Sequence, residues 1–219
     1  DTIDKILNIT YTPPTISLSG SSNVLREKGT TVSGITLSAA VTKQSDPIAA
    51  VRFYQGVTLL DTQVAGGAIP TGGTSTYVYA PSFTDNISFS AQADDNGATG
   101  GPTTVSSSTT YSFVYPYYYG AGAAGLGAAV AGLTKDIANN TSNYSKTLVS
   151  AGSQKLYVAY PASYGALTSI LDANLFEVIS TFTATTTNIT GLDGNPVSYR
   201  IYESNNLVIA GSFAFQFKK

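Results

Sequence analysis

The chain has 219 residues, with 11 basic residues against 13 acidic ones and no histidine or cysteine. A Ser-His-Asp or Cys-His catalytic site within this chain is therefore excluded, and so are disulfides. The balanced charge provides no basic stripe for a phosphate backbone, so we expect no nucleic-acid binding, and we also expect no metal and no cofactor. No apolar run reaches the roughly 18 residues that a membrane-spanning helix needs, so no membrane insertion is expected.

The polar residues are mostly uncharged. Charged side chains make up 11% of the chain, whereas serine, threonine, glycine and asparagine are abundant. Hydroxyl and amide groups of this kind suit exposed strands and turns better than long solvated helices. The composition predicts a mainly β protein, in which residues 1–14 form an N-terminal extension before the first strand pattern.

Residues 15–116 show the pattern of an immunoglobulin-like β-sandwich. Polar and apolar residues alternate in Ile35–Lys43, which is the period of a strand with one buried face, and the next strand would bury Ala49, Val51 and Phe53. Seven short segments of this kind, separated by Gly, Pro, Asn and Asp turns, are typical of the fold. These segments are Ile16–Gly20, Ile35–Lys43, Ile48–Gly56, Val57–Val64, 75–80, 86–93 and 109–116.

The loop Asp94–Gly101 contains a short run of oxygen-bearing side chains. Asp94, Asp95 and Asn96 carry ligand types that calcium accepts. The same residue types form ordinary turns, and the loop lacks a bidentate glutamate at a fixed later position. We interpret the segment as a hairpin loop, with a calcium site as the alternative.

Residues 117–132 and the residues just before them place tyrosine directly beside a run of glycine and alanine. Glycine lets backbones approach closely, and tyrosine offers a large rigid surface at low entropy cost. We interpret the stretch as an interdomain junction against which the sandwich packs, with a carbohydrate-stacking platform as the alternative. The junction residues are Tyr115, Tyr117, Tyr118, Tyr119 and Gly120.

Residues 133–219 are predicted to form a smaller β-rich (α+β) domain with one short helix. Apolar residues from Leu126 to Ile137 are spaced four, three and four apart, and the segment best suited to the helix is 133–140. Strands are expected at Lys155–Pro161, Phe176–Phe182, Val197–Glu203 and Ser212–Phe217.

Three tyrosines of this second half are candidate binding residues. Tyr157, Tyr160 and Tyr164 surround the sequence YVAYPASYG. Such a group packs within the sheet if it is buried, or contacts a ligand or receptor if it is exposed.

Carboxylates are the remaining candidates for chemistry. A pair of them at a suitable separation can hydrolyse a glycosidic bond, and Asp172, Glu177 and Asp193 are available. Asp193 lies in the sequence LDGNP, which is also a simple turn signal.

Segments spread from about Thr12 to Phe217 resemble the C-terminal region of tailed-bacteriophage tail structural proteins, which include tail-fibre, baseplate-associated and receptor-binding components. The shared elements are Glu27–Gly29, Tyr118–Gly120, Ala159–Gly165 and Ser169–Asn174. The resemblance carries no catalytic motif. It implies an extracellular place in the virion tail, other virion tail proteins and a host-surface receptor or glycan as partners, and a homo-oligomer, with a trimer favoured.

These observations favour a non-enzymatic structural and attachment module of a phage tail. One alternative is an immunoglobulin-like surface adhesin or filament subunit of a microbe, in which residues 1–14 would be donated as a strand to a neighbour. A glycan hydrolase that uses the carboxylates is the third interpretation.

Overall fold

The computed structural model describes residues 11–21, 25–64, 72–97, 104–139 and 143–219. Strands hold 65% of the residues, so the predicted mainly β class is confirmed. The chain divides into two compact units, Asp1–Val24 with Thr31–Ser112 and Leu25–Thr30 with Phe113–Lys219. The predicted N-terminal extension, and with it the donated strand of the adhesin alternative, falls mostly on residues 1–10, which lie outside the described residues.

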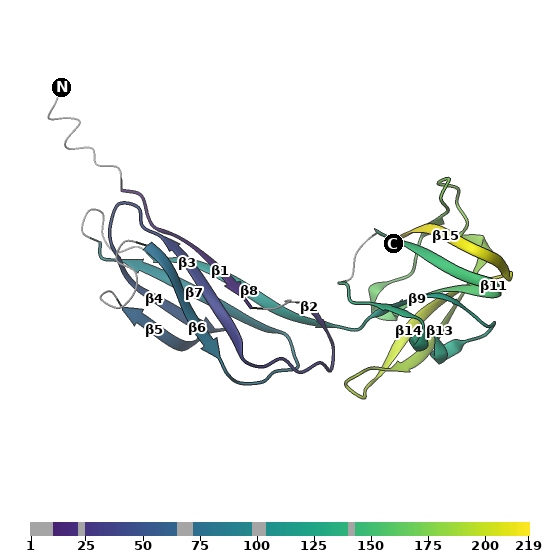
Figure 1. Ribbon diagram of the computed structural model, residues 1–219, viewed down its shortest axis with the longest axis horizontal. Helices are drawn as coiled ribbons and strands as arrows, with labels where there is room; N and C mark the ends of the chain where they lie inside the picture. Colours follow the sequence, from purple (N-terminus) through teal and green to yellow (C-terminus); the bar gives the residue numbers. More distant parts are fainter. Residues whose placement is uncertain (1–10, 22–24, 65–71, 98–103, 140–142) are drawn as a thin grey trace, which may run out of the picture. The chain divides into compact units, whose positions relative to one another are not determined.

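The first unit is an antiparallel β-sandwich (Figure 1). Its strands are β1 Thr15–Gly20, β3 Ile35–Thr42, β4 Ile48–Gln55, β5 Thr58–Val64, β6 Gly72–Tyr79, β7 Ile87–Asp95 and β8 Thr104–Val114. The short β2 Leu25–Glu27 pairs with β8, and its residues are counted with the second unit. One sheet has the order β1-β3-β6 and the other β8-β7-β4-β5. This is the A-B-E and G-F-C-C′ arrangement of immunoglobulin-like domains, so the predicted sandwich is confirmed.

Inward and outward side chains alternate along the strands of the sandwich, and the inward ones form its core. This alternation is interrupted at one point of β4. The inward residues of β3 and β7 are buried as predicted, except that Ile87 is only half-buried. On β4, a bulge between Ile48 and Ala50 adds one residue to the ladder, so these two residues are buried and Ala49 is half-buried. The predicted inward position of Ala49 is therefore corrected, because a bulge shifts the side-chain alternation.

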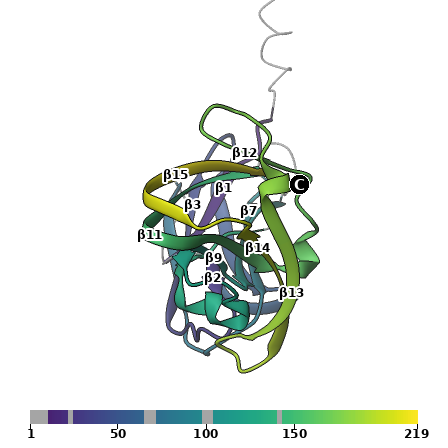
Figure 2. The same cartoon turned by 90° about the vertical axis from the view of Figure 1, so that its right-hand side faces the viewer.

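The second unit is organised around one long strand. The unit contains β9 Tyr117–Gly122, β10 Thr134–Asp136, β11 Asn143–Pro161, β12 Ser169–Leu171, β13 Phe182–Thr190, β14 Pro196–Ser204 and β15 Val208–Lys218. The first half of β11 pairs with β15, and the second half pairs with β9 and β14 (Figure 2). An irregularity at Ala151/Gln154, with a positive φ at Gly152 and Ser153, separates the two halves, because a bulge bends a strand.

Helical structure in the described ranges is limited to three short 3₁₀ turns: η1 Gly127–Gly132, η2 Ala162–Tyr164 and η3 Ile179–Thr181. The helix predicted at 133–140 is wrong, because Thr134–Asp136 pairs with β9 as a strand. The strand predicted at Phe176–Phe182 is also wrong, since this segment is largely a loop and η3, and β13 begins only at Phe182. No helix of the described part has the length and apolar character to cross a membrane.

Candidate functional site: a groove beside β15

The tyrosines expected at an interdomain junction belong to the second unit. Tyr117 and Tyr118 begin β9, and because side chains alternate along a strand, they enter two separate core clusters. Tyr115 packs against one of these clusters, and its hydroxyl donates to Asp193 Oδ2 at 2.8 Å. The segment 117–132 therefore forms a core strand of the second unit followed by η1.

The glycine-alanine run folds back on a buried tyrosine of β11. The Tyr157 hydroxyl donates to the carbonyl oxygen of Ala123 and accepts the backbone N–H of Leu126 at 3.4 Å. A Cβ added at Gly122 would lie 2.7 Å from Leu126 Cδ1, so no larger residue fits there without movement. Tyrosine thus supplies hydrogen-bond partners to a turn that has almost no polar side chains. This explains why the two residue types adjoin in sequence and in space.

The remaining junction residues have roles within the second unit too. Tyr119 packs against the core, and the Lys146 ammonium lies 4.7 Å from the centre of its ring. Gly120 has φ +150°, and an added Cβ there would contact Leu133 at 3.6 Å.

The three candidate binding tyrosines are mostly inside the second unit. Tyr157 and Tyr160 are 0% exposed, so neither ring offers an open surface to a macromolecular receptor, and the Lys219 ammonium lies over the Tyr160 ring. Tyr164 is half-buried on η2. The packing interpretation therefore accounts for the buried positions of both rings in the sheet. Sequence alternation could not show this, because Leu156–Pro161 is buried on both faces of its strand.

Burial of these hydroxyls makes stability depend on alkaline pH. Burial raises the pKa of Tyr157, Tyr160 and Tyr199 above the ordinary value of 10.0. The stabilisation is therefore fully present below about pH 10 and is lost above it, as the unfolded chain releases protons that the folded chain retains. We expect the free energy of unfolding to be flat from about pH 7 to 9 and to fall above pH 10.

Urea denaturation at a series of pH values measures this dependence. Tyr160→Phe is the informative variant, because the Tyr160 hydroxyl is buried and makes no hydrogen bond within the described residues. The variant should match the wild type at pH 7 and lose stability less steeply above pH 10. Equal slopes for the two proteins would show that this hydroxyl does not cause the loss.

Each of the candidate catalytic carboxylates accepts backbone hydrogen bonds from residues close to it in the chain. Glu177 accepts from the Ser169 hydroxyl and from the backbone N–H groups of Ile170 and Ile179, and these hydrogen bonds lower its pKa. The pKa of Asp193 is lowered by hydrogen bonds from Asn195 and from the Tyr115 hydroxyl. A glycosidase needs one carboxyl group with a raised pKa as its general acid. The shifts at Glu177 and Asp193 go in the opposite direction.

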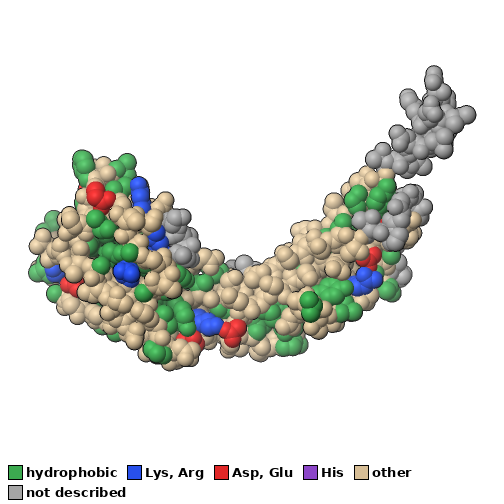
Figure 3. Space-filling model, turned by 180° about the vertical axis from the view of Figure 1, so that it is seen from behind, with side chains coloured by type: hydrophobic (Ala, Val, Ile, Leu, Met, Phe, Trp, Pro, Cys, Tyr) green, Lys and Arg blue, Asp and Glu red, His purple; other side chains and the backbone are tan. Residues whose placement is uncertain are grey.

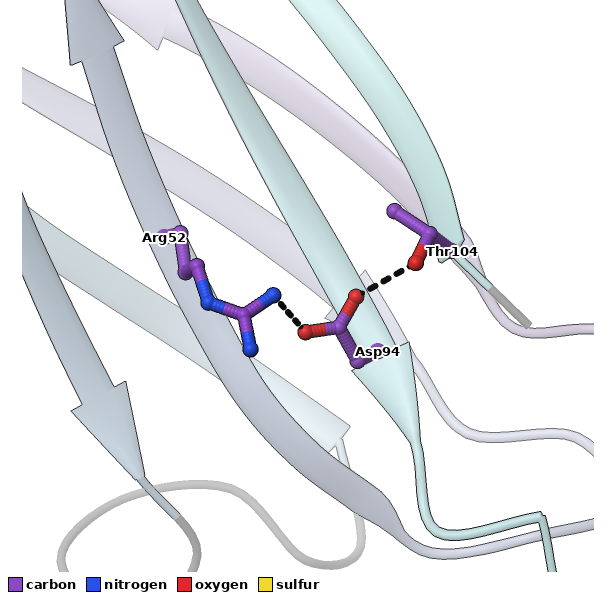
Figure 4. Close-up of polar contacts among 3 residues, drawn as sticks. All are labelled: Arg52, Asp94 and Thr104. Carbon is purple, nitrogen blue, oxygen red and sulfur yellow. Dashed lines mark hydrogen bonds and ion pairs between the residues drawn. The ribbon is translucent and has the colours of Figure 1, made fainter. Parts of the chain in front are cut away.

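The acidic side chains at the end of β7 make hydrogen bonds and an ion pair within the sandwich (Figure 4). Asp94 forms an ion pair with Arg52 and accepts from the Thr104 hydroxyl at 2.6 Å. Asp95 accepts from the Tyr11 hydroxyl and from the backbone N–H of Gly97. These contacts favour the hairpin interpretation over calcium; positions 98–101 lie outside the described residues. Within the described ranges, no three acidic side chains gather as a metal site would require.

A groove runs along the outer part of β15 in the second unit. It is bounded by Ser212–Gln216 of β15, by Ser145–Thr147 of β11 and by Asp172–Asn174 of the loop after β12. We call it the β15 groove. It consists of two adjoining hollows of about 310 and 350 Å³, and the second extends towards Val178 and Thr181. The groove forms because β12 pairs with the end of β15, and the chain then leaves the sheet before returning at η3.

The lining of the β15 groove combines an aromatic ring with uncharged polar groups. The half-buried Phe215 ring packs edge-on against Phe182 at 5.6 Å and is thereby fixed in the wall. Gln216 and Ser145 are paired across the two strands and are exposed on the face opposite the Phe215 ring, whereas the Lys146 ammonium is paired with Asp136. The predicted strand Ser212–Phe217 gave no sign of this groove.

The loop at the edge of the groove is held in a constrained conformation. Asp172 Oδ1 accepts the backbone N–H groups of Asn174 and Phe176, both at 2.9 Å, and Leu175 has φ +66°. A positive φ is uncommon outside glycine, and such strain persists only where the surroundings impose it. The side chains of Leu175 and Phe176 are 61% and 67% exposed. The loop therefore presents two large apolar side chains to solvent beside a partly polar groove.

Comparison with known protein families and with curated proteins finds no match for the sequence.

Proposed function

We propose that the chain is a non-enzymatic structural and attachment module of a bacteriophage tail, and that its second unit binds a host-surface glycan at the β15 groove. In this proposal the sandwich is a spacer or docking unit for neighbouring tail proteins, and the module works in a homo-oligomeric appendage, with a trimer favoured. The observation that carries the proposal is the groove with its constrained apolar loop.

The chemistry of the groove suits a saccharide. Sugars bind through one apolar ring face, for which Phe215 and Phe176 offer aromatic surface, and through hydroxyl groups that need several donors and acceptors. Asp172 Oδ1 accepts two backbone hydrogen bonds within the loop. Asp172 Oδ2 makes no hydrogen bond within the described residues and can accept one from a ligand. Gln216 adds both a donor and an acceptor.

The general character of the surface supports the same role. The face seen in Figure 3 is mostly uncharged, with lysine, arginine, aspartate and glutamate side chains scattered singly or in pairs. Such a surface suits the recognition of neutral hydroxyl-rich polymers rather than of phosphate backbones. The resemblance of the sequence to tail structural proteins supplies the virion context of the proposal.

The test is binding of the purified chain to a panel of bacterial capsular polysaccharides and lipopolysaccharides. Phe176→Ala and Gln216→Ala should each weaken binding about tenfold, which corresponds to about 1.4 kcal/mol. Ile209→Ala is the matched control, because Ile209 is 79% exposed in the same unit and lies outside the groove. The proposal fails if no polysaccharide binds, or if all three variants bind like the wild type.

A further inference from the structure

A second cluster of the same unit, separate from the β15 groove, encloses a positive charge in aromatic rings. The Lys219 ammonium lies 4.6 Å from the ring centre of Tyr160, 4.9 Å from that of Tyr164 and 5.5 Å from that of Tyr117. Its Nζ also donates to the Tyr117 hydroxyl at 3.2 Å. Three rings from β9, β11 and η2 therefore converge on one ammonium group.

The rings are positioned by the core and not by the lysine alone. Tyr117 packs against Tyr160 at 5.6 Å and against Tyr164 at 5.7 Å between ring centres. Tyr144 lies behind them, 5.1 Å from Tyr117, and Tyr202 stacks on Tyr160 at 6.1 Å. Because these rings support one another, we expect the arrangement to persist when the lysine side chain is removed.

The cluster also contains unused polar groups. The hydroxyls of Tyr144 and Tyr160 are buried and make no hydrogen bond within the described residues. Buried hydroxyls without partners are rare in folded proteins. The faces of three electron-rich rings attract a cation, and the Tyr117 hydroxyl accepts one of its N–H groups, as it does from Lys219.

We propose that Tyr117, Tyr160 and Tyr164 form a binding site for primary alkylammonium ions, which Lys219 fills in the unliganded chain. A primary ammonium is favoured over a quaternary one because the bond from Lys219 to the Tyr117 hydroxyl uses an N–H donor. An incoming ligand must displace Lys219, which acts as an intramolecular competitor at millimolar effective concentration. The site is independent of the proposed glycan groove, with which it shares no lining residue.

The test replaces Lys219 by alanine and adds n-butylammonium, a small molecule with the same ammonium group as the lysine side chain. Lys219→Ala should bind n-butylammonium saturably, with shifts of the ring resonances of Tyr117, Tyr160 and Tyr164 in NMR spectra. The wild type should bind it about tenfold more weakly. Tetramethylammonium, which cannot donate a hydrogen bond, should bind the variant more weakly than n-butylammonium does.

Two further variants make the result decisive. Lys218→Ala removes the neighbouring positive charge and should behave like the wild type. Lys219→Ala combined with Tyr164→Leu should lose n-butylammonium binding, since it removes one ring that is only half-buried. The proposal is overturned if folded Lys219→Ala shows no saturable shifts in these rings, or if Lys218→Ala responds to the same extent.

Discussion

Replacing Tyr157 by alanine is expected to lower the free energy of unfolding of the second unit by about 3–5 kcal/mol. The ring is 0% exposed, in a cluster with Val130, Ile189 and Tyr199, so its removal leaves a large cavity in the core. Loss of its hydroxyl also removes the partner of Ala123 in the glycine-alanine turn. Urea denaturation with hydrogen exchange of peptides from 143–161 measures the effect in this unit.

Tyr157→Phe separates packing from hydrogen bonding. It keeps the ring and leaves the carbonyl of Ala123 and the N–H of Leu126 without this partner, so it should cost about 1–2 kcal/mol. Val149→Ala, at a position 65% exposed on the same strand, should change stability by less than about 0.5 kcal/mol. If Tyr157→Ala costs no more than Val149→Ala, the tyrosine does not support the turn or the core.

Phe89→Ala is expected to cost the sandwich about 3–5 kcal/mol as well. Phe89 is 1% exposed and packs edge-to-face with Tyr79 at 4.9 Å and with Tyr111 at 6.1 Å. Phe83 completes the cluster, at 6.3 Å from Phe89. Hydrogen exchange of peptides from β3 and β7, with urea denaturation of the whole chain, measures the loss.

Exposed positions of the same unit provide the comparison for Phe89. Val57 is 98% exposed, and Val57→Ala should change stability by less than about 0.5 kcal/mol. Phe89→Leu retains much of the apolar volume and should fall between the two. A Phe89→Ala protein as stable as Val57→Ala would show that the aromatic cluster is not the core of the sandwich.

The sandwich was predictable because its strands obey a simple rule. In β3 and β7, one face is buried and the other meets solvent, so the alternation of residue types is visible in the sequence. The bulge at Ile48/Ala50 broke the rule at the start of β4, where Ala49 is half-buried, whereas Val51 and Phe53 are buried as predicted.

Parts of the second unit resisted prediction because some of its strand segments are buried, or exposed, on both faces. Thr183–Thr186 of β13 is exposed throughout, and Leu156–Pro161 of β11 is buried throughout, so neither shows alternation. The helical spacing around Leu126 and Val130 arises instead from η1, in which the first residue, Gly127, and the nearby Gly125 have positive φ. Pairing with β9 then overrides the helical preference of the residues that follow.

The candidate site was predictable only in part. Asp172 and Glu177 were singled out as carboxylates, but their roles in closing the loop depend on backbone groups that no residue pattern reveals. The positive φ of Leu175, which turns Phe176 outward, is rare for leucine and could not be expected from the sequence.

The most direct test of glycan attachment is an NMR titration of the isotopically labelled chain with the surface polysaccharide that binds best in the panel. The expected result is saturable shift changes concentrated in Ser145–Thr147, Asp172–Phe176 and Ala214–Gln216, the residues that form the β15 groove and its loop. Shift changes confined to the sandwich or to β13, with these three segments unchanged, would contradict the assignment of attachment to the groove.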